Sequence, residues 1–394
     1  MLIYLYPLFF GLFFFLIKEK KNNPFYASII FIYFLSSIFS VYIYIGDGKY
    51  GGSYMDLDAI LFHCLCLLML LLPLRRFERF RKIRITKENN STIFIMSLFF
   101  IFCGLYAFFE IIPKVSLFSI ISETQELRTL MDTETIHDSY FTYFGVKYWT
   151  VSLVLAFYNI RFNPHNKILI IFLFISSLCY IVDGLRFAGR ECLLKYAFLF
   201  IVFLYFFSDG MSDSWKRILK FGLFIGGGVG VAFFAIITFM RFDISQVEQQ
   251  SSVQDSIISY FGQGFVNFPS RFHFFPNGLS HGHALFPFFF GYGRSSFDSS
   301  GLDLKTFSTS IGSWVQDLGI LGAFVLTCIY TFLLRLVTRI KCNVFTFIYV
   351  AWSLEFIFSL LFFYNDLLNG SRVISLFAII MFDILVRNSK SVRT

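Results

Sequence analysis

Long apolar runs recur along the whole of this 394-residue chain, and they constrain its fold more than any motif does. A helix of about 20 apolar residues crosses the hydrocarbon layer of a bilayer. The chain is 57% hydrophobic and only 15% charged, whereas about a quarter of the residues of a soluble domain are charged. The short alternating segments of a membrane barrel are absent. The sequence therefore predicts an all-α, polytopic integral membrane protein.

The apolar runs predict about eleven transmembrane helices within a single integral membrane domain, residues 1–394. The first run lacks a basic leader and a small-residue cleavage site, so it is expected to be a span rather than a signal peptide. The expected spans are 2–17, 25–45, 58–74, 92–112, 146–160, 167–184, 192–207, 217–239, 309–334, 343–364 and 371–386.

Basic residues gather in alternate connections between these spans. Loops that face the cytoplasm are enriched in Lys and Arg, so this pattern predicts an outward N-terminus and a cytoplasmic C-terminus. The net charge of +8 is then a signal for membrane orientation, and no nucleic-acid partner is expected. The following segments hold 21 of the 33 basic residues: KEKKNN (18–23), RRFERFRKIRITKE (75–88), RFNPHNK (161–167), SWKRILK (214–220), RLVTRIK (335–341) and RNSKSVRT (387–394).

Two of the outward loops predicted by this topology are long, 113–145 and 240–308. Long loops in compact domains are usually functional. The second contains ALFPFFFG, which is too short to span a bilayer and is expected to lie at the interface or to re-enter the membrane.

The outward turn DGLRFAGRE carries charges that the topology does not require. Arg186 and Arg190 are four residues apart, so they would share one face of a helix beginning near Leu185. Two interpretations stay open. The arginines could form structural ion pairs with Asp183 and Glu191, or they could bind an anionic ligand while these carboxylates orient them.

Further outward arginines favour the ligand-binding interpretation. They are Arg241, Arg271, Arg294 and Arg372. Each alone is typical of an interfacial anchor, but several planar guanidinium groups on one side suit bidentate recognition of phosphate. Together they predict a diphosphate site.

Two other motifs carry weaker predictions. His281 and His283 in LSHGHALF lack a third ligand of suitable spacing, so we expect hydrogen bonding to sugar or phosphate, or a structural role, and no metal. GGGVG (226–230) lacks the Lys of a phosphate loop and predicts close helix packing.

Several of these features together resemble the O-antigen polymerases (Wzy), the bacterial polymerases of oligosaccharide repeat units. They are the GRE turn (189–191), FMRFD (239–243), the large late outer loop and KTFSTSIGSWVQDLGILGAFV (305–325) directly after it. The resemblance covers the whole layout of the chain. The family is similar to the O-antigen ligases, and both have a membrane glycosyltransferase architecture of the GT-C type. Gly319 and Gly322 are expected to serve helix packing.

The resemblance implies a metal-independent glycosyltransferase without a cofactor, acting at the periplasmic face of the bacterial inner membrane. The implied partners are a donor and an acceptor oligosaccharide, both linked to undecaprenyl diphosphate, besides membrane lipids; a chain-length regulator is a further candidate. An acceptor hydroxyl would attack the anomeric carbon of the donor, and lipid diphosphate would leave. Fixed cations matter most where such charge develops.

These roles imply a set of site residues. Arg190 and Arg241 are expected to bind the diphosphate, and Glu191, Asp183 and Asp243 to orient the arginines or act as general base. The expected substrate-binding residues are Arg186, Arg271, His281, His283, Arg294 and Arg372.

Two alternatives stay open. An O-antigen ligase, which transfers finished polymer to lipid A core, would differ only in its acceptor. A transporter or flippase of lipid-linked sugars should have repeated halves with broken helices and charges at the bilayer midplane. The charges here cluster at one boundary, and no repeat is visible, which favours an enzyme.

Overall fold

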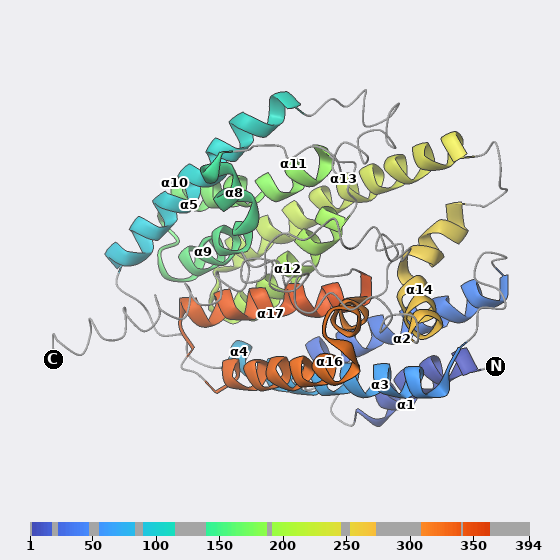
Figure 1. Cartoon of the computed structure of the whole chain (residues 1–394). Helices are drawn as coiled ribbons and strands as arrows, with labels where there is room; N and C mark the ends of the chain where they lie inside the picture. Colours follow the sequence, from blue (N-terminus) through green and yellow to red (C-terminus); the bar gives the residue numbers. More distant parts are fainter. Residues whose placement is uncertain are drawn as a thin grey trace. The chain divides into compact units, whose positions relative to one another are not determined.

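A computed structural model of the chain describes residues 2–17, 23–46, 55–82, 90–114, 139–186, 191–245, 253–272, 309–339 and 342–362 (Figure 1). The described residues form helices and no strand, so the predicted all-α class is confirmed for this part of the chain. The predicted span 371–386 and most of the loop 240–308 lie outside it.

Six helices within the described residues are long and apolar enough to cross a membrane, and they indicate a membrane protein. They are Pro24–Gly46, Leu57–Arg81, Ser91–Lys114, Lys167–Arg186, Glu191–Gly210 and Thr309–Val337. Leu2–Leu16 and Val344–Phe358 are apolar but shorter. The total of eleven spans and the orientation of the termini stay predictions.

The chain divides into two compact units. Unit 1 comprises Met1–Glu78, Gln254–Ile340 and Phe356–Thr394, and unit 2 comprises Arg79–Val253 and Lys341–Glu355. Unit 1 contains η1 (Leu2–Tyr4), α1 (Leu5–Leu16), α2 (Pro24–Gly46), α3 (Leu57–Leu71), η2 (Leu72–Arg76), α14 (Val253–Arg271) and α16 (Thr309–Val337). Helix α17 (Val344–Phe362) contributes its beginning to unit 2 and its end to unit 1.

The core of unit 1 is built around His63 of α3. Its Nδ1 lies 2.9 Å from the hydroxyl of Tyr6 in α1, and its ring stacks on Phe268 of α14 with centroids 4.2 Å apart. The backbones of α14 and α2 approach closely, because a Cβ on Gly262 would lie 2.6 Å from the backbone of Phe39. A polar side chain in a membrane span, such as His63, needs a hydrogen-bond partner from the protein, such as Tyr6, since lipid offers none.

Unit 2 contains α4 (Arg79–Lys82), α5 (Asn90–Ile111), η3 (Ile112–Lys114), α8 (Tyr140–Lys147), α9 (Trp149–Phe162), α10 (Lys167–Ser177), α11 (Cys179–Arg186), α12 (Glu191–Phe207), η4 (Ser208–Gly210) and α13 (Asp213–Ser245). Helix α9 is buried at every position from Trp149 to Ile160, which fits a helix that is apolar on all sides. Helices α5 and α10 pack directly: a Cβ on Gly104 would lie 2.7 Å from that of Ser176.

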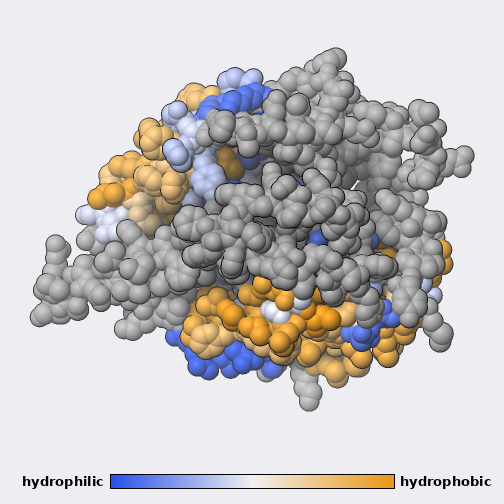
Figure 2. Space-filling model, in the orientation of Figure 1, coloured by the Kyte–Doolittle hydropathy of each residue, from blue (hydrophilic) through white to orange (hydrophobic). Residues whose placement is uncertain are grey.

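Both units expose apolar side chains, as helices that face lipid must. In unit 1, α16 exposes Leu321 and Phe332, and in unit 2, α5 exposes Ile95 and Phe109. Figure 2 shows hydrophobic residues on the surface where Figure 1 draws these two helices.

The basic connections of unit 2 meet at one end of its helices. Arg81 donates from Nε and Nη2 to the carboxylate of Asp209, at 3.2 Å each. A Cβ on Gly210 would lie 2.3 Å from Nε of Arg161, so the loop after α9 lies at the same end. Helix α12 ends beside this cluster. It is 17 residues long and begins at Glu191, which places Glu191 roughly 25 Å away at the opposite end.

In unit 1 the basic connections also share an end. The side-chain amide of Asn23, before α2, donates to the carbonyl of Arg75 at 2.6 Å. Arg75 and Arg335 line the same pocket, so the ends of α3 and α16 lie side by side.

Arg186 belongs to the last turn of α11. The expected helix that would join it to Arg190 lies outside the described residues, because 187–190 are not among them. The expected close packing at GGGVG is wrong for the described residues, because a Cβ on Gly226, Gly227, Gly228 or Gly230 would meet nothing within 4 Å. Gly319 interrupts α16, with φ 74° and ψ 177°, a break that the expected role in helix packing did not include.

Candidate functional site

Three of the predicted site residues have described side chains, and these three lie at the junction of α11 and α12. They are Asp183, Arg186 and Glu191. The backbones of Arg241 and Asp243 belong to the end of α13 and that of Arg271 to the last turn of α14, but their side chains lie outside the described part of the chain. The remaining predicted site residues also lie outside it: Arg190, His281, His283, Arg294 and Arg372.

Arg186 is a largely buried cation held by a carboxylate of its own helix. Its Nη2 donates to Oδ1 of Asp183 at 2.8 Å, and only 8% of its side chain is exposed. A guanidinium removed from water needs an anionic partner. The ion pair between Asp183 and Arg186 therefore forms as the structural interpretation of this turn predicts.

Glu191 forms its ion pair within the next helix, with Lys195 one turn later. Lys195 is 2% exposed, although it is charged. Glu preceding Lys by four residues is the favourable order on a helix, and Glu at a helix start is stabilised by the helix dipole. Sequence reasoning missed Lys195, and the signal available was this spacing inside an apolar run.

Aromatic rings hold α11 and α12 in place below these charges. Trp149 of α9 stacks on Tyr180 of α11, with centroids 4.7 Å apart, and on Tyr196 of α12, at 5.2 Å. The hydroxyl of Tyr196 lies 2.8 Å from Oγ of Ser177. The two ion pairs are thus carried by helices that three stacked rings fix to one another.

A second polar cluster, centred on Glu110, lies where α5 ends and α8 begins. Its carboxylate accepts hydrogen bonds from Oγ of Ser139 at 2.8 Å and from Oγ1 of Thr142. Nζ of Lys114 lies 3.6 Å away. Helix α11 packs on both α5 and α8. Sequence reasoning missed Glu110, because the two hydroxyl groups that it binds, of Ser139 and Thr142, are about 30 residues away along the chain.

Unit 1 carries a buried polar segment at the start of α16, before the break at Gly319. The buried residues are Thr309, Ser310, Ser313, Gln316 and Asp317, and Asp317 is 0% exposed. Trp314 of this segment stacks on Tyr330 and Phe356, with centroids 5.3 and 5.6 Å apart. An ionisable residue buried in a membrane helix is a functional candidate. The polar run FSTSIGSWVQD was the signal for it, but Asp317 was not among the predicted site residues.

The junction of α11 and α12 presents two buried cations, each oriented by a carboxylate, at the end of unit 2 opposite its basic loops. Such an arrangement suits the binding of an anion through charge-assisted hydrogen bonds. Among the described residues, no group of three or more His, Cys, Asp or Glu side chains could hold a metal ion. Comparisons of the chain with protein-family models, with curated proteins and with solved structures each find no significant match.

Proposed function

We propose that this protein is an O-antigen polymerase of the Wzy type, a GT-C-like glycosyltransferase of the bacterial inner membrane. It joins oligosaccharide repeat units carried on undecaprenyl diphosphate at the periplasmic face. The observation that carries the proposal is the buried Arg186, held by Asp183 at the end of α11 opposite the basic loops.

The orientation of unit 2 supports a site on the periplasmic side. Arg81 and Arg161 lie near Asp209 at one end, and the positive-inside rule assigns such basic ends to the cytoplasm. The N-terminus of α12 lies roughly a bilayer thickness away. Asp183, Arg186 and Glu191 then face the periplasm, where lipid-linked repeat units are polymerised.

The chemistry of the reaction accounts for the charges. A hydroxyl of the acceptor sugar attacks the anomeric carbon of the donor, the bond from that carbon to the diphosphate oxygen breaks, and the hydroxyl proton passes to a base. Negative charge grows on the departing lipid diphosphate, so fixed guanidinium groups lower the barrier. We assign this role to Arg190 and Arg241, with Arg186 and Arg271 in support.

The carboxylates act mainly as positioning groups in this proposal. Asp183 is already bonded to Arg186 and Glu191 to Lys195, so each holds a cation in a fixed direction. A preorganised cation stabilises developing charge without the cost of reorienting during the reaction.

Two alternatives share some of this support. A ligase that transfers polymer to lipid A core would use the same donor chemistry with another acceptor. A transporter of lipid-linked sugars is favoured by one observation, the break of α16 at Gly319 after a buried polar segment, because transporter sites are built at broken helices.

Deletion of the gene, followed by display of surface polysaccharide, separates the three functions. Loss of a polymerase leaves lipid A core carrying one repeat unit, and a plasmid copy of the gene restores the polymer. Loss of a ligase leaves lipid A core without any unit. Loss of a flippase strands the unit in the cytoplasm. Either of the last two results would contradict the proposal.

A further inference from the structure

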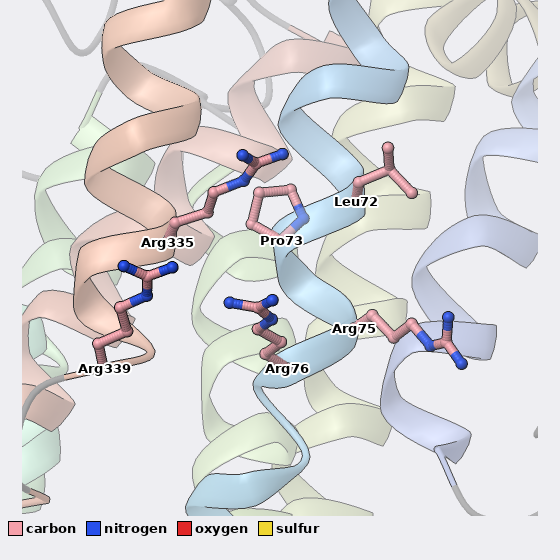
Figure 3. Close-up of a pocket in the computed structure, with 6 residues that line it drawn as sticks. All are labelled: Leu72, Pro73, Arg75, Arg76, Arg335 and Arg339. Carbon is pink, nitrogen blue, oxygen red and sulfur yellow. The ribbon is translucent and has the colours of Figure 1, made fainter.

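A second cationic site lies in unit 1, far along the chain from the residues of the proposed active site. It is a cavity of about 370 Å³ lined by Leu72, Pro73, Arg75, Arg76, Arg335 and Arg339 (Figure 3). This volume falls within the range of about 300–1,000 Å³ that is typical of small-molecule sites. Its residues play no part in the proposed polymerase chemistry.

The sequence builds this cavity from the ends of two packed helices. The 3-10 helix η2 follows α3 directly, with Pro73 in its first turn and Arg76 as its last residue. Arg335 lies in the last turn of α16, and Arg339 lies in the turn that follows, where its backbone N–H donates to the carbonyl of Leu336 at 2.8 Å. Leu74 and Leu334 are fully buried beside them and anchor the two ends.

Three of the four guanidinium groups converge. Figure 3 shows Arg76, Arg335 and Arg339 directed into the space between η2 and α16, whereas Arg75 points the other way. Within the described residues, the side chains of these three arginines form no ion pair or hydrogen bond. Three like charges held together repel each other unless an anion lies among them.

The same helices expose apolar side chains next to the cations. Leu72 is 41% exposed, and Phe332 and Leu336 of α16 are 60% and 37% exposed. Arg335 and Leu336 follow Phe332 by three and four residues, so apolar and cationic side chains share one face of α16. Acyl chains could lie on the apolar part while a phosphate binds the cations above it.

We propose that Arg76, Arg335 and Arg339 bind the phosphate of an anionic phospholipid whose acyl chains lie along Phe332 and Leu336. Guanidinium groups bind phosphate oxygens through pairs of parallel hydrogen bonds. In a zwitterionic lipid, the headgroup's own ammonium offsets the negative charge of the phosphate, so such a lipid should bind these arginines less well. Basic pockets between membrane helices recognise anionic headgroups in this way. The site binds a structural lipid rather than the undecaprenyl-linked substrate, and it does not depend on the proposed function.

The test measures lipid binding to the full-length protein purified in detergent. Native mass spectrometry and thermal unfolding would be followed with added phosphatidylglycerol, with phosphatidylcholine of the same acyl chains, and with inorganic phosphate. The variant replaces all three converging arginines, R76Q, R335Q and R339Q. R75Q is the matched control, because Arg75 lines the same cavity but points away from it.

We expect phosphatidylglycerol to bind and to raise the melting temperature. The triple variant should bind it with an affinity lower by about 10-fold or more. R75Q should bind as the wild type does. The four arginines are exposed, so the variants should fold, and equal melting temperatures in phosphatidylcholine would verify this. Equal binding of phosphatidylcholine, equal stabilisation by inorganic phosphate alone, or unchanged binding by the triple variant would each overturn the lipid site.

Discussion

Asp183 and Arg186 form an ion pair of 2.8 Å within the last turn of α11, and the guanidinium is 8% exposed while the carboxylate is 23% exposed. The pair is local, because both partners belong to one helix three residues apart. It therefore exists before any ligand arrives, and a ligand would meet a guanidinium whose direction Asp183 already sets.

We expect Asp183→Ala to destabilise the protein by about 1–3 kcal/mol, because it removes a carboxylate that pairs with a buried cation. Arg186→Ala should cost less, since Asp183 is closer to water. The double variant should recover most of the loss, as a double-mutant cycle requires of a direct pair. Thermal unfolding in detergent measures all three.

Asp213 and Lys216 supply the matched control for that cycle. They are also three residues apart on a helix, at 3.4 Å, but Asp213 is 91% exposed. Alanine at either position should change stability by less than about 0.5 kcal/mol. If Asp183→Ala behaved like this exposed pair, the ion pair at the end of α11 would not hold Arg186 in place.

Much of the fold could be predicted, because apolar length alone identifies a membrane helix. Pro24–Gly46 and Ser91–Lys114 lie close to the expected spans 25–45 and 92–112. The interruptions at Tyr148 and Leu178 could not be predicted, since the apolar pattern continues through both. The break at Gly319 was equally hidden, because glycine also occurs inside straight membrane helices.

The candidate site was predicted only where its contacts are local. Asp183 and Arg186 are three residues apart, and Glu191 and Lys195 are four apart, so both ion pairs can be inferred from the spacing in the sequence. Glu110 and its partner Thr142 are 32 residues apart, so only the packing of α5 on α8 brings them together.

The second prediction is that the proposed diphosphate site requires arginine, and not merely a positive charge, at positions 190 and 241. Arg190→Ala and Arg241→Ala should abolish polymer while protein levels stay near normal. Lysine at either position should restore only part of the activity, because an ammonium lacks the bidentate fork of a guanidinium. Polysaccharide gels of a complemented deletion strain measure this, and Arg217→Ala, an exposed position on α13, is the control. If the Arg190→Ala variant made polymer of normal length and amount, the segment DGLRFAGRE would have only a structural role.

Reporter fusions test the predicted orientation. Fusions at Asn22, Lys82, Asn166, Ser214 and Lys341 should report cytoplasm, and fusions at Gly51, Glu126 and Ser252 the outer side. The basic ends within each unit are the physical reason, because they anchor those loops in the cytoplasm. A cytoplasmic signal at Ser252 would put the proposed site on the wrong face of the membrane.

Metal removal gives a fourth prediction. Chelator should have little effect on polymerisation by purified enzyme, since guanidinium groups supply the positive charge that a divalent ion would give to the departing diphosphate. His281→Ala and His283→Ala should also differ in effect, because independent hydrogen bonds fail separately, at about 1–3 kcal/mol each. If chelator abolished activity and one divalent ion restored it, the prediction would be wrong. A metal ion held by His281 and His283, rather than the arginines, would then stabilise the departing diphosphate.

The break in α16 gives the last prediction. Gly319 has φ 74° and ψ 177°, a backbone conformation that side chains with a Cβ rarely adopt. Gly319→Ala should therefore destabilise the protein by about 1–3 kcal/mol, and the buried segment that ends at Asp317 should lose its position first. Gly226→Ala is the control: it lies within α13 with open space around it, and alanine favours a helix, so stability should be unchanged or slightly higher. Thermal unfolding compares the two, and cysteine accessibility at Ser313→Cys reports the segment itself. Equal melting temperatures for both alanine variants would mean that α16 continues unbroken through Gly319.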